Sequence, residues 1–326
     1  MTKFIGRRAS IGIGKETIRG TGVPADFWLN VLSFSHLDKV KKARANGTLG
    51  GIWGGEAALV AQKWAEGDIE VELGDKSFGL ILLAVFGSIS SDVEETTAYR
   101  HTYTLQNDNA HDSLSIYLDD PDRDLLFELS MIQSITITIV PDELVKYTVG
   151  FMSKSSADAD SNPSYSAENK FLGRYLEFKV AADTGSLTAA SQTKLKSLTI
   201  TIEKNLEMYN SLGSVQPDDI ANKLFTITGE LELLYENDTM RDLMLDGSYQ
   251  AARIDLVNSD VLIGSDPTTH PTFRLDLSKC DFESWDADYA LDDLVNQTIT
   301  FTALYDVGGN DNVINSCYLI NEHISY

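Results

Sequence analysis

The residues with the clearest chemical pattern are carboxylates that recur at every second position in two short segments. Asp68, Glu70 and Glu72 alternate with other residues in the first segment, and Glu230 and Glu232 do so in the second. Side chains alternate between the two faces of a β-strand, so each segment predicts a strand with its acids on one face. Such a face is either simply solvated, or it lines a passage for a polyanion. In the second case its negative charge repels the polyanion within about 8 Å of the wall.

Other arrangements that could support chemistry do not complete a known motif. Gly14-Lys15 is followed by Glu16, where a phosphate-binding loop needs a Ser or Thr hydroxyl. Segment 158–163 begins like a calcium loop, but Pro163 replaces the glycine of the sharp turn. The histidines lack metal-ligand spacing, and no Gly-x-Ser-x-Gly nucleophile is present. We expect no catalytic residue, cofactor or metal site. A hydrolase that uses two of the many carboxylates is the least supported of the three functions considered for this sequence.

Charge is distributed unevenly along the chain. The 326 residues include 49 Asp or Glu and 26 Lys or Arg, a net charge of -23. The first 47 residues carry nine basic and three acidic side chains, a net of +6 that leaves -29 for the remainder. A basic end on an acidic body suits head-to-tail docking of identical copies, although a merely solvated arm has the same composition.

The elements that position these residues are mainly strands. Period-two alternation rich in β-branched residues predicts half-buried antiparallel strands in four segments. These segments are 135–139, 198–202, 225–233 and 298–302.

Two short helices are expected, each directly after an acidic strand. Asp75 or Ser77 is a candidate cap for the first helix, and Gly87 is its expected end. The second helix has candidate caps at Asn237 or Thr239 and ends at Gly247. The first is apolar on nearly all sides and the second is amphipathic, so both must pack on a sheet.

The order of strand, polar corner and helix in Gly67–Ser88 recurs in Gly229–Ser248, which indicates an internal duplication. Segment 153–166 has the composition of a linker. We therefore predict two tandem antiparallel β-sandwich or partial-barrel domains, 1–155 and 156–326, each with one flanking helix. The first adds a basic N-terminal arm and a glycine-rich loop, 36–56, that is either a gripping arm or a plain surface loop.

Cellular location is constrained by three features. Cys280 and Cys317 are too few for a disulfide framework, so both are expected to be reduced. The N-terminus has no apolar run typical of a signal peptide, and the longest apolar run, Phe78–Phe86, is too short to cross a bilayer. Synthesis in the cytoplasm and no membrane partner are expected.

The order of several segments carries a family likeness. The N-terminal run Gly6–Thr17 is followed by Gly22-Val-Pro24, and the Gly67 strand runs into a helix that ends at Phe86-Gly87. The second half contains the run Ser197–Leu231. In this order the chain resembles the major tail tube protein of long-tailed, siphophage-type bacteriophages over nearly its whole length.

The resemblance implies a non-enzymatic virion protein in the phage tail, made in the host cytoplasm. Its subunits would close into rings around an inner β-barrel, stack through loops and terminal arms, associate with other tail proteins, and conduct DNA without binding it specifically. A duplicated chain implies a trimer with pseudo-sixfold symmetry, and a single elaborated domain implies a hexamer.

Residue roles follow from this resemblance. The lumen face would hold Asp68, Glu70, Glu72, Glu230 and Glu232. The contacts between rings would be made by Lys3, Arg7, Arg8, Lys15, Arg19, Lys39, Lys41, Lys42, Arg44 and Trp53. The alternative function is a carbohydrate- or receptor-binding β-sandwich module of a virion or cell surface, with exposed aromatics such as Trp53, Trp285 or Tyr289 in contact with a glycan.

Overall fold

The computed structural model describes residues 3–47, 49–52, 54–55, 57–292, 294–308 and 313–326. Within these ranges the chain is mainly β, as its alternating segments predict. The strands are β1 (Ser10–Lys15), β2 (Phe27–Leu29), β3 (Val31–Arg44), β4 (Ala58–Glu72), β5 (Gly87–Glu95), β6 (Ala98–Leu105), β7 (Leu114–Asp119), β8 (Leu125–Ile139), β9 (Lys146–Ser153), β10 (Ala157–Asp158), β11 (Leu176–Ala181), β12 (Ser197–Tyr209), β13 (Asp219–Leu234), β14 (Gln250–Val257), β15 (Thr272–Asp288), β16 (Asn296–Leu304) and β17 (Ile314–Asn321). The helices are α1 (Ser77–Phe86), α2 (Thr239–Leu245) and the short 3-10 turns η1 (Gly6–Arg8), η2 (Gly173–Tyr175) and η3 (Thr184–Ser186).

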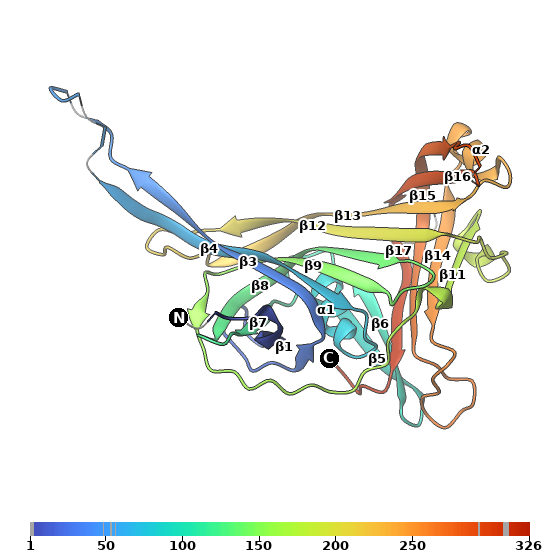
Figure 1. Cartoon of the computed structure of the whole chain (residues 1–326), viewed down its shortest axis with the longest axis horizontal. Coiled ribbons are helices and arrows are strands. Elements are labelled where there is room, and N and C mark those ends of the chain that lie inside the picture. Colours follow the sequence, from blue (N-terminus) through green and yellow to red (C-terminus); the bar gives the residue numbers. More distant parts are fainter. Residues whose placement is uncertain (1–2, 48, 53, 56, 293, 309–312) are drawn as a thin grey trace.

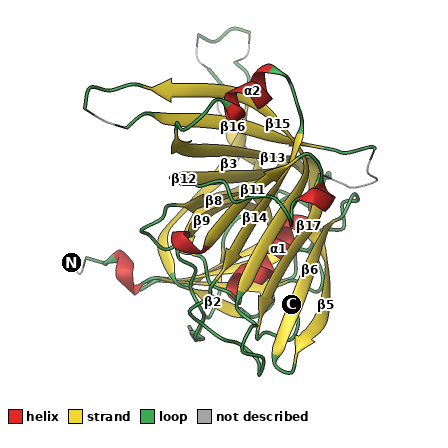
Figure 2. Ribbon diagram, turned by 90° about the vertical axis from the view of Figure 1, so that its right-hand side faces the viewer, coloured by secondary structure: helices red, strands yellow, loops and turns green. Residues whose placement is uncertain are grey.

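Eight strands form the long sheet that dominates the molecule. Their order is β3-β4-β9-β8-β12-β13-β16-β15, and every neighbouring pair is antiparallel. The pairing of β8 with β12 joins strands from the two halves of the chain, and β17 with β6 makes a second such junction. The sheet is open rather than closed into a barrel in the described part of the chain. Helix α1 lies beneath it, enclosed by the remaining strands (Figures 1 and 2).

Helix α1 is the centre of the hydrophobic core. All ten of its residues are buried, as expected for a helix apolar on every side, and Gly87 ends it at a φ of 86°, in the left-handed region that glycine favours. The predicted capping by Asp75 or Ser77 is wrong, because the carboxylate of Glu168 accepts the hydrogen bonds of the Ser77 amide and hydroxyl. Asp75 instead accepts hydrogen bonds from Asn169. A partner 91 residues away cannot be found from local sequence.

Helix α2 is a shorter counterpart at the far end of the sheet. Met240 is its buried residue, which agrees with its amphipathic pattern. The Asn237 side chain accepts a hydrogen bond from the Thr239 amide at 3.1 Å, and Gly247 adopts a φ of 60° just beyond the helix. Both the predicted start and the predicted stop of this helix are therefore close to those observed.

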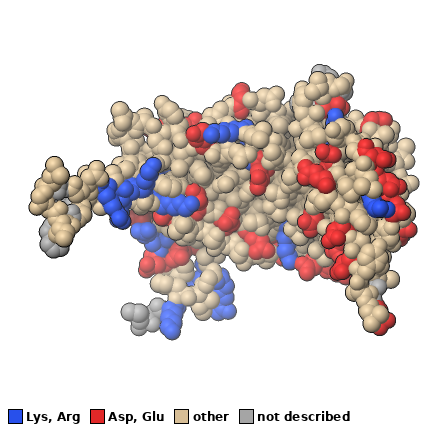
Figure 3. Space-filling view, turned by 90° about the horizontal axis from the view of Figure 1, so that it is seen from above, with Lys and Arg blue, Asp and Glu red and all other residues tan. Residues whose placement is uncertain are grey.

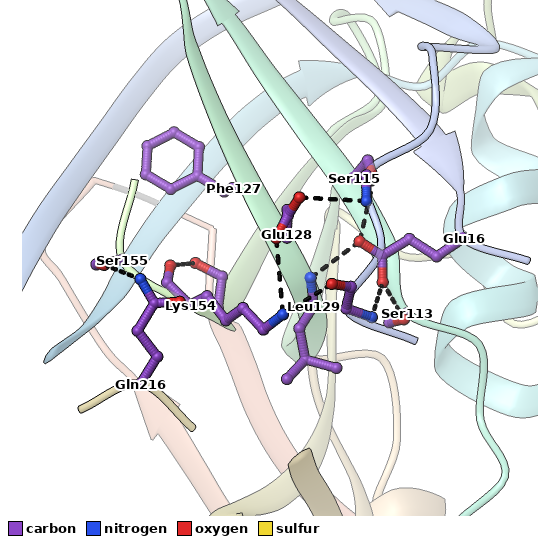
Figure 4. A network of polar contacts seen from close by, with 12 residues as sticks. Glu16, Ser113, Ser115, Phe127, Glu128, Leu129, Lys154, Ser155 and Gln216 are labelled. Carbon is purple, nitrogen blue, oxygen red and sulfur yellow. Dashed lines mark hydrogen bonds and ion pairs between the residues drawn. The ribbon is translucent and has the colours of Figure 1, made fainter. Parts of the chain in front are cut away.

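A buried carboxylate fixes the turn after β1 onto β8. Glu16, 3% exposed, accepts hydrogen bonds from the amides of Gly20 at 2.6 Å and Leu129 at 2.9 Å. It also accepts from the hydroxyls of Ser113 at 2.5 Å and Ser115 at 3.1 Å (Figure 4). Leu129 has a φ of 53°, a conformation that leucine rarely adopts, so the hydrogen bond from its amide to Glu16 helps to hold a strained irregularity within β8.

Lys204 is a buried base beneath the sheet. Its ammonium group donates to the Ala84 carbonyl at 2.8 Å and lies 3.1 Å from Nδ1 of His111. Burial, aided by the charge of Arg19, lowers the pKa of Lys204 to about 7. Burial and the proximity of Lys204 also lower the pKa of His111. A neutral amine keeps two N–H groups, which can donate to the Ala84 carbonyl and to Nδ1 of His111 while Nε2 of His111 donates to the Gln106 carbonyl, so its deprotonation is compatible with both contacts.

We predict that the free energy of unfolding rises between about pH 7 and pH 10, with a slope of up to about 1.4 kcal/mol per pH unit from this group. The sign follows because the unfolded chain binds a proton at Lys204 with a pKa of about 10.4, whereas the folded chain has already released it. Urea unfolding of wild type and Lys204→Met at several pH values measures this slope. A Lys204→Met variant with an unchanged slope would contradict the assignment.

Candidate functional site

The long sheet has one apolar face and one polar face. Ile69, Ile137, Ile200, Leu231 and Ile299 point to the apolar side and are at most 1% exposed. Their neighbours along each strand point the other way and are mostly Thr, Ser, Asp or Glu. This second side, here called the polar face, runs without interruption across all eight strands.

Strand register aligns threonines in a row across the polar face. Glu70 on β4 lies opposite Thr148 on β9, which lies opposite Thr136 on β8. The row continues through Thr201 on β12 and Thr228 on β13 to β16. The hydroxyls of Thr136 and Thr201 are 3.2 Å apart, at the junction of the two halves of the chain.

The structure brings together the five carboxylates singled out in the sequence. Asp68, Glu70 and Glu72 on β4 and Glu230 and Glu232 on β13 all lie on the polar face, with β9, β8 and β12 between the two strands. Further acids on this face were missed, and they are Glu66, Glu203, Asp281, Asp286 and Asp288. The alternation at 198–202 extends to Glu203 and could have indicated its face, whereas the acids of β15 lie in a strand that the sequence analysis did not predict.

Some of these carboxylates are partly neutralised. Lys196 lies 3.2 Å from Glu232 and Lys170 lies 3.9 Å from Glu72. Glu70 accepts a hydrogen bond from the Ser33 hydroxyl at 2.9 Å. Within the described residues Asp68, Glu203 and Glu230 have no ion pair, and all three are exposed.

Seen from above, acidic groups are spread over the molecule, and basic groups gather at the end that bears the β3–β4 hairpin (Figure 3).

Two sets of four strands within the sheet, β3-β4-β9-β8 and β12-β13-β16-β15, share connectivity and register. In one set Gly67 on β4 lies opposite Phe151 on β9, and in the other Gly229 on β13 lies opposite Phe301 on β16. A side chain on either glycine would meet the ring of that phenylalanine. Strand β8 has a bulge before Ser134 against β9, and β15 has a bulge before Ser284 against β16. The recurring glycine that opens each acidic segment is therefore a packing site for an aromatic ring.

The correspondence extends beyond these strands. β1 pairs with β7 as β11 pairs with β14, and the turns η1 and η2 directly precede β1 and β11. α1 follows β4 as α2 follows β13.

The long sheet ends in two edges that lack a strand partner within the described residues. One edge is the outer side of β3, which pairs only with β4. The other is the part of β15 beyond Cys280, where β16 occupies one side and β14 has ended. These open edges carry unpaired backbone groups and are binding sites for another strand.

The β3–β4 hairpin extends past the rest of the sheet as an arm (Figure 1). The expected loop 36–56 is wrong in part, because residues 36–44 belong to β3 and only 45–57 connect the strands. Leu49 and Ile52 in that connection are 107% and 91% exposed. Trp53 lies outside the described residues.

The predicted basic contacts divide into free and engaged groups. Lys3, Arg7 and Arg8 are exposed at the N-terminus. Lys41, Lys42 and Arg44 are exposed on the arm, whereas Lys39 pairs with Glu66.

Two of the predicted basic contacts bind their own chain. Lys15 pairs with Asp112 at 3.2 Å. Arg19 pairs with Asp219 at 2.7 Å and donates to the carbonyl of Ile220 at 2.7 Å, which ties the loop after β1 to β13. Their side chains are thus held within the subunit.

The described residues contain no group of three or more His, Cys, Asp or Glu side chains able to hold a metal ion. None of the helices described is long and apolar enough to cross a membrane.

A family model described as phage tail tube protein matches residues 6–305. No curated protein matches the chain.

Proposed function

Because this chain belongs to the phage tail tube protein family and so has a structural role in the virion tail, we propose that its copies join at their open edges into rings with the polar face inward. The rings stack into a tube that conducts DNA and associates with other tail proteins. The subunit would be made in the host cytoplasm before assembly.

The observation that carries this proposal is that one sheet has both a continuous polar face and an open strand edge at each of its two ends. A strand edge left in water promotes uncontrolled aggregation, and closure of the sheet removes it. Joining β15 of one copy to β3 of the next continues the same antiparallel pattern. The apolar face already packs on α1 within each subunit, which leaves the polar face to line the hole.

The dimensions of such a barrel favour three copies. Eight strands per copy, spaced about 4.8 Å apart and tilted about 40°, give a barrel about 48 Å across at the backbone for three copies. Side chains narrow this to roughly 38 Å, which leaves room for a DNA duplex whose grooves are about 8.5 and 7.5 Å deep. Six copies would give about twice the backbone diameter, far wider than a duplex needs. A trimer also uses the two similar strand sets as pseudo-sixfold repeats.

The chemistry of the wall suits passage rather than binding. Exposed carboxylates such as Asp68, Glu203 and Glu230 repel phosphate, and screening confines that repulsion to about 8 Å at physiological ionic strength. The threonine rows between them present neutral hydroxyls. DNA would therefore meet a surface on which carboxylates outnumber lysines, and the lysines Lys39, Lys170 and Lys196 are paired with carboxylates.

Electron microscopy and sedimentation of purified protein test the proposal. We expect particles with a central hole and a mass of three subunits, and filaments at higher concentration. A protein that remains a monomer at all concentrations and ionic strengths would contradict it.

The arm is proposed to join successive rings. An isolated two-stranded ribbon is at best marginally stable in water, and this one exposes Val40 and Leu59 together with Lys41 and Lys42. The acidic surface of a subunit in the next ring would cover the apolar side chains of the arm and would carry a charge opposite to that of its lysines.

Shortening the arm should separate stacking from ring formation. With residues 45–57 replaced by an Asn-Gly turn, we expect rings of normal mass and few or no filaments, as seen by microscopy and sedimentation. Lys41→Glu with Lys42→Glu should weaken filaments in the same direction, and Lys41→Arg with Lys42→Arg is the matched control. Filaments of normal length from the shortened variant would contradict the role of the arm.

A further inference from the structure

The strand pairing that joins the two strand sets inside one chain can be repeated between two chains. β8 of the first set and β12 of the second are hydrogen-bonded neighbours. Their register places Ile139 opposite Leu198, Thr136 opposite Thr201, and Ser134 opposite Glu203.

Each open edge corresponds to one side of this junction. On β8, β7 pairs with the first half of the strand and β12 takes over from Ser134 onward. On β15, β14 pairs with the first half in the same way, but the edge from Ser284 onward has no strand partner in the described chain. The free side of β3 likewise corresponds to the side of β12 that meets β8. The position next to β15 is therefore shaped for a strand such as β3.

The shared register converts this correspondence into residue pairs. Phe151 and Phe301 are equivalent, and counting along the paired strands makes Thr136 equivalent to Asp286. Gly67 and Gly229 are also equivalent. Gly67 lies opposite His36 on β3 and Gly229 lies opposite Ile200 on β12, so His36 is equivalent to Ile200. These two alignments leave a single register for β15 against β3.

We propose that β15 of one copy pairs with β3 of the next in the register of the β8–β12 junction, an inference that rests on the proposed ring. On the polar face the pairs are Asp288 with Ser35, Asp286 with Leu37, and Ser284 with Lys39. On the other face they are Tyr289 with Phe34, Ala287 with His36, and Trp285 with Asp38.

The chemistry of these positions fits a joint. Tyr289 is 67% exposed and Leu37 is 58% exposed in the single chain, and pairing covers both side chains. Tyr289 reaches Phe34, which already packs on the core, so the hydrophobic core continues across the boundary. Lys39 comes to lie diagonal to Asp286, within reach of an ion pair. The two surfaces differ, so the contact is head-to-tail and a closed ring satisfies every copy.

Cysteine pairs test the register directly. We expect Leu37→Cys with Asp286→Cys in one chain to give, after mild oxidation, covalent dimers and trimers on a non-reducing gel. The two positions lie seven strand spacings apart within a chain, about 33 Å, so no internal disulfide can form. The native cysteines Cys280 and Cys317 are buried. Leu37→Cys alone and Asp286→Cys alone should remain unlinked, and mixing them should give linked dimers only.

Leu37→Cys with Ala287→Cys is the matched control, because the inferred register places these side chains on opposite faces of the sheet. Stronger linkage in this control, or in Leu37→Cys with Ser284→Cys, would overturn the register. Rings visible by microscopy without linkage of the expected pair would overturn the register while preserving the proposed function. Absence of rings in wild type under every condition would overturn both.

Discussion

Ser35→Asp with Leu37→Asp is expected to prevent ring formation without unfolding the subunit. In the inferred register the two new carboxylates face Asp288 and Asp286 of the next copy. They also lie opposite Asp68 and Glu66 on β4 of their own chain, so urea unfolding of the variant must confirm that the subunit remains folded. Like charges directly opposite one another on neighbouring strands cost up to about 1 kcal/mol per pair, or about 6 kcal/mol for a ring with three joints. That is about four orders of magnitude in the formation constant of the ring.

Sedimentation at several concentrations measures this loss. Ser35→Lys with Leu37→Lys is the matched control, because lysines facing the same aspartates should preserve or strengthen the ring. Adding Asp286→Lys and Asp288→Lys to the doubly acidic variant should restore assembly by exchanging the charges. Equal assembly by the acidic and basic variants would show that these residues do not face one another.

Glu16→Leu is expected to lower the free energy of unfolding by about 3–5 kcal/mol, because four donors lose their buried acceptor. Two are the amides of Gly20 and Leu129, which cannot turn elsewhere, and two are the hydroxyls of Ser113 and Ser115. Loss of the bond to Leu129 also leaves its left-handed conformation with less support.

Urea unfolding in the doubly acidic Ser35→Asp and Leu37→Asp background measures this effect without interference from assembly. Glu16→Gln keeps the shape and one acceptor oxygen, so it should cost less than Glu16→Leu. A cost below about 1 kcal/mol for Glu16→Leu would mean that water or nearby groups replace the carboxylate.

The polar face was largely predictable because its pattern is local. Alternation alone places Asp68, Glu70 and Glu72 together, and the threonine alternations of other segments identify strands of the same kind. The sequence also predicts both helices and the glycines that follow them. These features depend on neighbouring residues and on backbone conformations that few residue types adopt.

Features that depend on long-range pairing were not predictable from one sequence. The order of strands that brings β4 and β13 onto one face comes from registers between segments far apart in the chain. Glu168 as the partner of Ser77, Arg19 as a tie to Asp219, and Glu16 as a buried acceptor all require tertiary contacts. The glycine-rich segment suggested a loop because glycine disfavours strands, whereas the hairpin arm is set by the pairing of its flanks.

The most direct test of the central claim is an electron cryomicroscopy reconstruction of the assembled protein. The account predicts three subunits per ring and a closed barrel of strands, with Glu230 and Thr201 lining the central hole and α1 outside the wall. A ring that turns its polar face outward, or subunits joined by surfaces other than β3 and β15, would contradict it.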